Sequence, residues 1–275
     1  MVTSTRSPRV RTARSLAKRA LRERSRLFLA EGPQAVREAL GRDGGITELF
    51  VTAPAQSRHA GLIAAVAATG APVHEVSGEV MSELAQTVTP QGLLAVCPFI
   101  DVPLTDLIAA EPRLVVVLAN VRDPGNAGTV LRTADAAGAQ GVIFADASVD
   151  PYNSKCVRSS AGSLFHLPLV LGVSVSRAVT ALRGARLAVL AADGSATLGL
   201  DELDRAGRLG QPTAWLFGNE AWGLPADLVA LADEAVSVPI YGQAESLNLA
   251  AAAAVCLYAS ARAQYAQYGG AAQSH

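Results

Sequence analysis

The sequence is poor in cysteine and has no residue cluster that would predict a disulfide framework or a metal site. Its three cysteines, Cys97, Cys156 and Cys256, are widely spaced and form no CxxC pair, which favours a reducing, cytoplasmic setting. The four histidines are scattered along the chain. We therefore expect no metal site, because metal ligands occur at close, regular spacings.

Long apolar runs are also missing. The longest, Leu249–Ala259, is too short and too rich in alanine to cross a bilayer, and no apolar segment follows the basic start as in a signal peptide. Neither secretion nor membrane insertion is expected. The sequence also lacks a Gly-Lys-Ser/Thr motif, which excludes a phosphate-binding loop of the P-loop type.

Positive charge is concentrated at one end of a chain whose formal net charge is only −1. Residues 1–26 contain nine arginines and lysines and one acid, Glu23. Such a segment indicates a polyanionic partner. For the leader at residues 1–14, a disordered and solvated segment is the alternative.

Two domains are predicted from the pattern of short elements. Over residues 15–98, a basic helix and helices at 31–40 and 61–68 alternate with strands at 47–52, 72–76 and 92–98, which predicts a small α/β domain. The proline-rich segment 99–112 is predicted to be a linker.

Residues 113–268 predict a larger α/β domain, and 269–275 a tail. Apolar strands such as Leu114–Ala119 and Thr213–Gly218 alternate with helices, which is typical of a mostly parallel sheet covered on both faces. Ligands of such sheets bind beyond the carboxyl ends of the strands, so the loops there are the candidate site.

Three of these loops carry polar groups. In the first, Asn126 is suited to cap the following helix, and Arg132 lies about two turns further on. In the second, Gly218 would let a ligand approach the backbone, and Glu220 would place a carboxylate beyond the strand. The third leads through Ser246 and Asn248 into an apolar helix, where capping by Ser246 is the structural alternative. Each loop alone is a weak indication.

Together and in this order, the loops resemble the three motifs of the SpoU-type methyltransferases of the SPOUT superfamily: N…N-x-G-x-x-x-R-T-A, G-x-E-x-x-G and P-x-x-G-x-x-x-S-L-N. Segments 150–153 and 158–163 resemble the family's intermediate region. FLAEGPQAVREAL at 28–40 resembles its substrate-binding domain, which is related to a ribosomal-protein fold. The matching motif residues are Asn120, Asn126, Gly128, Arg132, Thr133 and Ala134, then Gly218, Glu220 and Gly223, then Pro239, Gly242, Ser246, Leu247 and Asn248.

The resemblance implies an S-adenosylmethionine-dependent RNA 2′-O-ribose methyltransferase that works as a homodimer through a carboxyl-terminal SPOUT α/β domain with a deep trefoil knot. Arg132 is implied as the central catalytic residue. Because a guanidinium stays protonated, charge stabilisation is favoured, and proton removal stays open. Whether Arg132 serves its own subunit or the partner is also open. The residues implied around it are Asn126, Glu220, Ser246 and Asn248; those at the cofactor are Gly218, Val238, Leu247 and Ala192; those on RNA are Arg11, Arg14, Lys18, Arg22 and Arg158.

The preferred substrate is 23S ribosomal RNA, with transfer RNA as the alternative. Two other classes of protein are alternatives to a methyltransferase. A non-catalytic RNA-binding or ribosome-assembly protein on the same fold would not need Arg132, Glu220 and Asn248, which are all present. A nucleotide-dependent oxidoreductase would need a glycine-rich turn after its first strand, and the fingerprint is missing.

Overall fold

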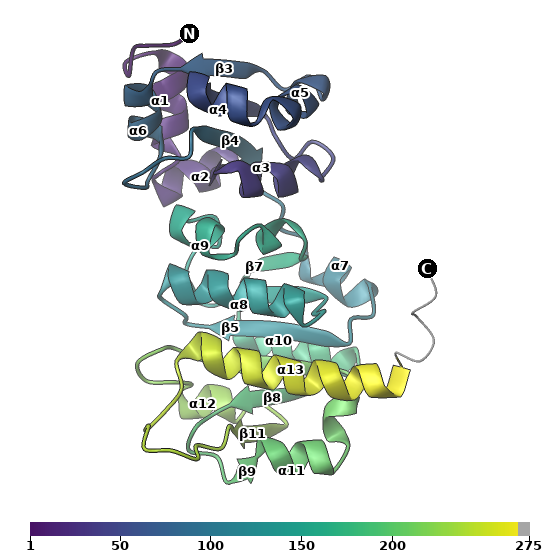
Figure 1. The fold of residues 1–275 in the computed structure, drawn as a ribbon. Helices are drawn as coiled ribbons and strands as arrows, with labels where there is room; N and C mark the ends of the chain where they lie inside the picture. The colour runs from purple at the N-terminus through teal and green to yellow at the C-terminus, as the bar shows by residue number, and fades with distance from the viewer. Residues whose placement is uncertain (269–275) are drawn as a thin grey trace. The chain divides into compact units, whose positions relative to one another are not determined.

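A computed structural model describes residues 1–268 and divides the chain into two compact units (Figure 1). The first unit comprises residues 1–100 together with 150–166, and the second comprises the remaining described residues. The division of the chain after Ile100 falls inside the predicted linker, 99–112. Segment 150–166, predicted within 113–268, instead packs with the first unit. The predicted tail, 269–275, lies outside the described residues.

The first unit is built on a four-stranded mixed sheet with the order β1-β4-β2-β3. β4 pairs antiparallel with β1 and β2, and β3 pairs parallel with β2. The strands are β1 (Leu27–Glu31), β2 (Glu48–Thr52), β3 (Val73–Val76) and β4 (Leu93–Pro98), and the helices before segment 150–166 are α1 (Pro8–Ser15), α2 (Arg19–Ser25), α3 (Pro33–Leu40), α4 (Ala53–Arg58), α5 (Ala60–Ala68) and α6 (Gly78–Leu84).

The predicted helix at 31–40 is a strand end followed by a shorter helix. β1, which was not predicted, ends at Glu31, and Gly32 turns the chain at a φ of 95°. Pro33 then starts α3, a position that tolerates proline because its missing N–H would have no helical partner. The leader also differs from the disordered alternative, since α1 buries Val10 and Ala13 in the core of this unit.

Segment 150–166 completes the first unit through aromatic packing. It contains α9 (Ser154–Ser159) and the short 3-10 helix η1 (Ser163–Phe165). The ring of Phe28 in β1 lies 4.7 Å from that of Tyr152 and 5.9 Å from that of Phe165, and the Tyr152 hydroxyl accepts a hydrogen bond from the Ile100 amide at 2.9 Å. The segment therefore belongs to the core of this unit, although the chain reaches it from β6 of the other.

The second unit contains a seven-stranded parallel sheet with the order β7-β6-β5-β10-β8-β11-β9. From β5 the chain builds outward through β6 and β7, and it later returns to the other side of β5 with β10. The junction between β5 and β10 is thus a topological switch point, where parallel sheets bind their ligands. The strands are β5 (Leu114–Ala119), β6 (Gly141–Ala145), β7 (Leu169–Val173), β8 (Ala188–Ala192), β9 (Leu198–Gly199), β10 (Thr213–Phe217) and β11 (Glu234–Ser237).

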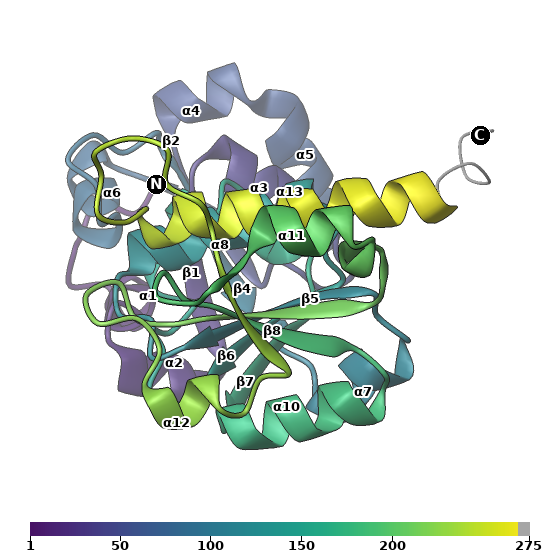
Figure 2. The same ribbon diagram turned by 90° about the horizontal axis from the view of Figure 1, so that it is seen from below.

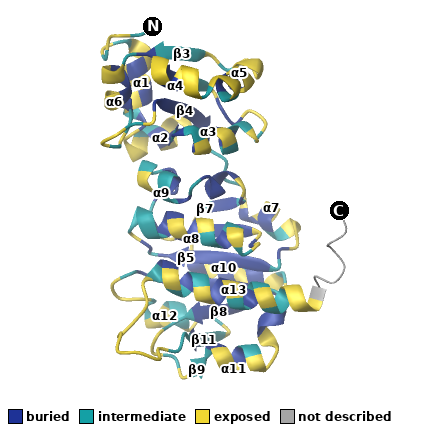
Figure 3. Ribbon diagram, in the orientation of Figure 1, coloured by how far each residue is buried: buried dark blue, intermediate teal, exposed yellow. Residues whose placement is uncertain are grey.

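Helices cover both faces of this sheet, as predicted. One face carries α8 (Pro124–Ala136), α11 (Leu200–Arg205) and α13 (Leu249–Tyr268), and the other carries α7 (Leu104–Ala109), α10 (Val175–Gly184) and α12 (Ala226–Val229) (Figure 2). The central strands β5, β6 and β10 are buried between them, whereas the outer helix faces are exposed (Figure 3). Helix α7 lies in the predicted linker and packs its leucines onto the sheet.

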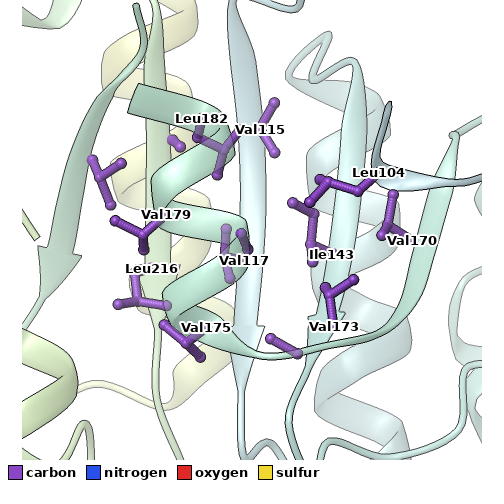
Figure 4. Packing of buried hydrophobic residues seen from close by; sticks show 14 of the residues in the cluster. Leu104, Val115, Val117, Ile143, Val170, Val173, Val175, Val179, Leu182 and Leu216 are labelled. Atoms are coloured by element: carbon purple, nitrogen blue, oxygen red, sulfur yellow. The ribbon is translucent and has the colours of Figure 1, made fainter. Parts of the chain in front are cut away.

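Alternate residues of each strand face the two layers. Val115 and Val117 of β5 and Leu216 of β10 lie in the cluster beneath α10 (Figure 4). Trp215 of β10 faces the opposite layer, where its indole N–H donates to the Ser260 hydroxyl of α13 at 2.9 Å. Among the described residues, no helix is long and apolar enough to span a membrane.

Candidate active site at the carboxyl ends of β5, β10 and β11

The loop after β5 is shaped by asparagine and aspartate. Asn120 adopts a φ of 56°, a left-handed conformation that asparagine tolerates better than most residues. Asp123, rather than the predicted Asn126, caps α8, and its Oδ1 accepts a hydrogen bond from the Asn126 amide at 2.8 Å. The side chain of Asn126 is therefore available for contacts outside the helix.

Glu220, from the loop after β10, binds the start of α8. Its Oε1 accepts hydrogen bonds from the Asp123 amide at 3.0 Å and from Asn126 Nδ2 at 3.4 Å, and its Oε2 accepts one from the Arg122 amide at 3.2 Å. A carboxylate at a helix N-terminus is favoured by the helix dipole and by amides that lack helical partners. Glu220 thus ties the β10 loop to the β5 loop.

Asn248 extends this network to the third loop. Asn126 must present its amide nitrogen to the Glu220 carboxylate, which only accepts hydrogen bonds, so its oxygen is left for Asn248. Asn248 Nδ2 donates to that oxygen at 3.2 Å, and Asn248 Oδ1 accepts from the Ala250 amide at 2.9 Å, which caps α13. The predicted residues Asn126, Glu220 and Asn248 therefore form one hydrogen-bonded chain.

Asn219 was not predicted, yet it joins the same loops. It is 6 % exposed, and its Nδ2 donates to the Asn120 carbonyl at 2.9 Å while its Oδ1 accepts from the Ala221 amide at 2.8 Å. Its own amide and carbonyl pair with those of Gly223, each at 2.9 Å. The only signal in the sequence is an asparagine directly between Gly218 and Glu220.

Gly218 is required by the chain itself. A Cβ at this position would lie 2.4 Å from the carbonyl of Gly223 and 2.5 Å from the Leu224 nitrogen. The predicted close approach at Gly218 is therefore made by the backbone of the same loop, so a substitution here would open the turn and would not simply fill a ligand pocket.

The predicted cofactor residues lie at the mouths of neighbouring strands. Ala192 ends β8, Gly218 follows β10, and Val238 follows β11, and these three strands are adjacent in the sheet. Ala192 and Val238 are partly exposed, and Leu247 is 38 % exposed. Within residues 1–268, the main-chain groups of Val238 and Leu247 have no hydrogen-bond partner, so they can bind a ligand with donor and acceptor atoms.

Arg132 and Ser246 lie outside the hydrogen-bonded chain. Arg132 is exposed on α8, about 9 Å further along the helix axis than Asn126. Ser246 is also exposed. In the part of the chain that the structure describes, neither side chain has a hydrogen-bond or ion-pair partner.

The five predicted RNA-binding residues, all in the first unit, have different environments. Arg11 and Lys18 are exposed and line a surface hollow with Arg14, which pairs with Glu83 at 2.8 Å. Arg158 faces Glu31, with 3.8 Å between Nη1 and Oε2. These four side chains remain accessible at least in part.

Arg22 corrects the prediction. It is 3 % exposed, its Nε and Nη2 donate to Asp150 at 2.9 and 2.6 Å, and its Nη1 donates to the carbonyls of Leu16 and Ala17. Since all three nitrogens are occupied, Arg22 is a structural ion-pair partner and is not available to a phosphate.

Comparisons with known proteins identify the family of the chain. The profile of the SpoU rRNA Methylase family matches residues 113–258, and that of an MRM3-like substrate binding domain matches residues 7–95. Among curated proteins, the chain is 33 % identical over 257 residues to the 23S rRNA (guanosine(2553)-2′-O)-methyltransferase RlmP of Bacillus subtilis, covering 94 % of this chain and 97 % of the relative.

Two solved structures share the fold. An AdoMet-bound rRNA methyltransferase from Sinorhizobium meliloti superposes with a TM-score of 0.84 at 34 % identity, covering 95 % of this chain and 97 % of that one. The SpoU methyltransferase AviRb from Streptomyces viridochromogenes, in complex with the cofactor AdoMet, gives a TM-score of 0.83 at 28 % identity, covering 94 % and 100 %.

Proposed function

Because the chain belongs to the SpoU rRNA methylase family, we propose that it transfers a methyl group from S-adenosylmethionine to a ribose 2′-hydroxyl of ribosomal RNA. The chain is accordingly an enzyme, an RNA 2′-O-ribose methyltransferase with S-adenosylmethionine as its cofactor. The observation that carries this function is the hydrogen-bonded chain Glu220–Asn126–Asn248, which joins residues of all three family motifs at the carboxyl edge of the parallel sheet.

The methyl donor is proposed to bind at the mouths of β8, β10 and β11. The main-chain groups of Val238 and Leu247 would hydrogen-bond its adenine, with Gly218 and Ala192 beside them. When bound, the cofactor supplies an electrophilic sulfonium methyl group. Partly exposed apolar side chains such as Val238 would then exclude water from the adenine.

Calorimetry tests this placement. We expect the full-length protein to bind S-adenosylmethionine and not NAD. Ala192→Trp should abolish binding, because the indole would fill the end of β8, whereas the matched Ala226→Trp on the exposed surface of α12 should bind normally. Binding of NAD, or no binding of S-adenosylmethionine to the wild type, would contradict the proposed cofactor. Normal binding by Ala192→Trp would contradict only its placement.

Catalysis is proposed to rest on charge stabilisation and positioning. A ribose hydroxyl is a weak acid, so negative charge that develops on its oxygen must be stabilised. Arg132 is exposed and without a partner in residues 1–268, which supports this role. Asn126, Glu220 and Asn248 would orient the nucleotide through their fixed amides, and Ser246 would contact it from the third loop.

A homodimer is proposed to form through the carboxyl-terminal domain. Val255, Tyr258 and Tyr265 of α13 are between 42 % and 59 % exposed and recur on one helix face. Their spacing supports an apolar stripe that a second copy would cover. The deep trefoil knot is part of this proposal; it is supported by the family and by the return of the chain from β11 to α13, which packs on α8, β5 and β10.

The first unit is proposed to bind the RNA and to have the ribosomal-protein-like fold. Its match to a substrate binding domain and the exposed Arg11, Arg14 and Lys18 support this assignment.

None of the three cysteines forms a disulfide, and all are buried, which supports the proposed reducing, cytoplasmic setting.

Charge reversal tests the RNA-binding surface better than truncation, because deleting the amino-terminal residues would leave Tyr152 and Phe165 without their core partners. We expect Arg11→Glu with Lys18→Glu to weaken RNA binding and to reduce the slope of log affinity against log salt by about 1 to 2. Arg37→Glu with Arg58→Glu makes the same charge change on exposed sites of the same unit. RNA affinity is measured by anisotropy at a series of salt concentrations. If the two double variants lose affinity equally and show the same salt dependence, a localised phosphate-binding surface is refuted.

A further inference from the structure

The first unit contains a small polar cavity that the three methyltransferase motifs do not account for. It has a volume of about 220 Å³ and lies between the end of β1, the segment before β4, and α9. Ligand pockets for drug-sized molecules are usually about 300 Å³ or larger, so this cavity suits a smaller group. Its polar lining comes from Glu31, Gln34, Thr87, Thr89, Gln91 and Arg158.

Glu31 is the acidic residue of this cavity, and burying a carboxylate is unfavourable unless a hydrogen-bond donor or a cation pairs with it. Its side chain is 8 % exposed. The Thr87 hydroxyl donates a short hydrogen bond to Oε1, and Arg158 Nη1 lies 3.8 Å from Oε2, which is beyond hydrogen-bond range. Within residues 1–268, Oε2 therefore accepts no hydrogen bond and Oε1 accepts only one, so both oxygens of this buried carboxylate retain accepting capacity inside the cavity.

Arg158 adds an unused donor beside it. Its Nη1 is buried and has no hydrogen-bond partner, although buried polar groups of folded proteins nearly always have one. Leaving such a group unsatisfied is unfavourable, and for a charged group the penalty is larger. A ligand that donates to Glu31 and accepts from Arg158 would satisfy both groups at once.

We propose that this cavity binds an unpaired guanine base of the RNA substrate, with Glu31 reading its N1–H and 2-amino groups and Arg158 donating to its O6. Among the four RNA bases, guanine alone presents two adjacent donors next to an acceptor on its Watson–Crick edge. Sequence-specific RNA recognition generally uses unpaired bases and this edge. On the same edge, adenine and cytosine have one donor group next to an acceptor, and uracil has one donor between two acceptors. Each of these bases would therefore place an acceptor atom opposite the Glu31 carboxylate.

The proposal deepens the proposed RNA methyltransferase function and rests on it, but its test does not require methyl transfer. Fluorescein-labelled UUUGUUU, UUUAUUU and UUUIUUU, where I is inosine, are titrated against the full-length protein without cofactor and followed by anisotropy. We expect the guanine oligonucleotide to bind about tenfold more tightly than the adenine one, since a good bidentate base contact contributes about this discrimination. Inosine, which lacks the 2-amino group, should fall between them.

Three variants locate the effect. Glu31→Gln should remove the preference for guanine, and Glu79→Gln, which neutralises an exposed acid of the same unit, should retain it. If Glu31→Gln fails to fold, Thr89→Trp fills the cavity from an exposed position and leaves Glu31 and Arg158 in place, and it should also remove the preference. Guanosine monophosphate at the oligonucleotide concentration should not displace UUUGUUU, because it lacks the flanking phosphates.

Equal binding of the guanine and adenine oligonucleotides by the wild type would overturn the proposal, as would a guanine preference that survives in a folded Glu31→Gln or Thr89→Trp variant. Displacement by guanosine monophosphate would overturn the assignment to RNA. None of these results affects the proposed function, which fails only if the wild type does not methylate a ribose 2′-hydroxyl of ribosomal RNA.

Discussion

Glu220→Ala is expected to lower turnover by about 100-fold at saturating RNA and cofactor. The substitution removes the acceptor of three hydrogen bonds that hold the β5 loop and Asn126. Hydrogen bonds to a charged group contribute about 1.5–3 kcal/mol each, and about 2.7 kcal/mol of lost transition-state stabilisation corresponds to 100-fold in rate. We expect a far smaller change in stability, because water can reach the half-buried loop amides once the carboxylate is gone.

Single-turnover kinetics and thermal melting separate the two effects. Glu220→Gln, which keeps one acceptor oxygen, should recover part of the rate. Asp227→Ala, which removes an exposed carboxylate from α12, is the matched control and should be fully active. An active Glu220→Ala enzyme would remove the Glu220–Asn126–Asn248 chain from the catalytic site. A loss of rate that matches a loss of folded protein would make its role purely structural.

Arg132→Ala is expected to reduce turnover by about 100-fold to 1,000-fold, the loss found when one donor to a developing oxyanion is removed. Arg132 has no partner in residues 1–268, and no hydrogen bond of that region joins it to the Glu220–Asn126–Asn248 chain. We therefore propose that it serves the methyl donor bound by the partner subunit, so that each site of the homodimer is shared.

Mixed dimers test whether the site is shared. One subunit carries Arg132→Ala and the other Ala192→Trp, after calorimetry has verified that the latter has lost the cofactor. Gly218→Trp is unsuitable as the second lesion because any Cβ there meets the Gly223 backbone. If Arg132 acts across the interface, one of the two sites contains both substitutions and the other contains neither. About half the wild-type activity should then return. Tagged, purified mixed dimers that stay inactive would place Arg132 in its own subunit.

The convergence of the three loops could be predicted from the sequence because parallel strands bring their carboxyl ends to one edge. Continuous apolar runs such as Leu114–Ala119 identified the strands, and the loops that carry the motif residues followed them. Which atoms meet could not be predicted. The sequence suggested Asn126 and Ser246 as helix caps, whereas Asp123 and Asn248 cap α8 and α13. Several polar residues within a turn compete for the cap, and tertiary contacts decide between them.

Other features depend on contacts between distant parts of the chain. In the sequence, Arg22 resembles the other residues of a basic segment, but in the structure it is buried and forms an ion pair with Asp150, 128 positions away. Segment 150–166 follows a strand of the second unit and yet supplies Tyr152 and Phe165 to the core of the first. No local period or propensity carries such information, since it resides in aromatic packing and ion pairs that only the folded chain forms.

The most direct test of the central claim is the chemical identity of the product. Total RNA from a strain that lacks the gene is incubated with the purified full-length protein and S-adenosylmethionine labelled in its methyl group, and is then separated into ribosomal and transfer RNA and digested to nucleosides. We predict label in a 2′-O-methylnucleoside of the 23S ribosomal RNA, formed about 100-fold or more slowly by Arg132→Ala. Label on a base, label confined to transfer RNA, or no label at all would each contradict the account.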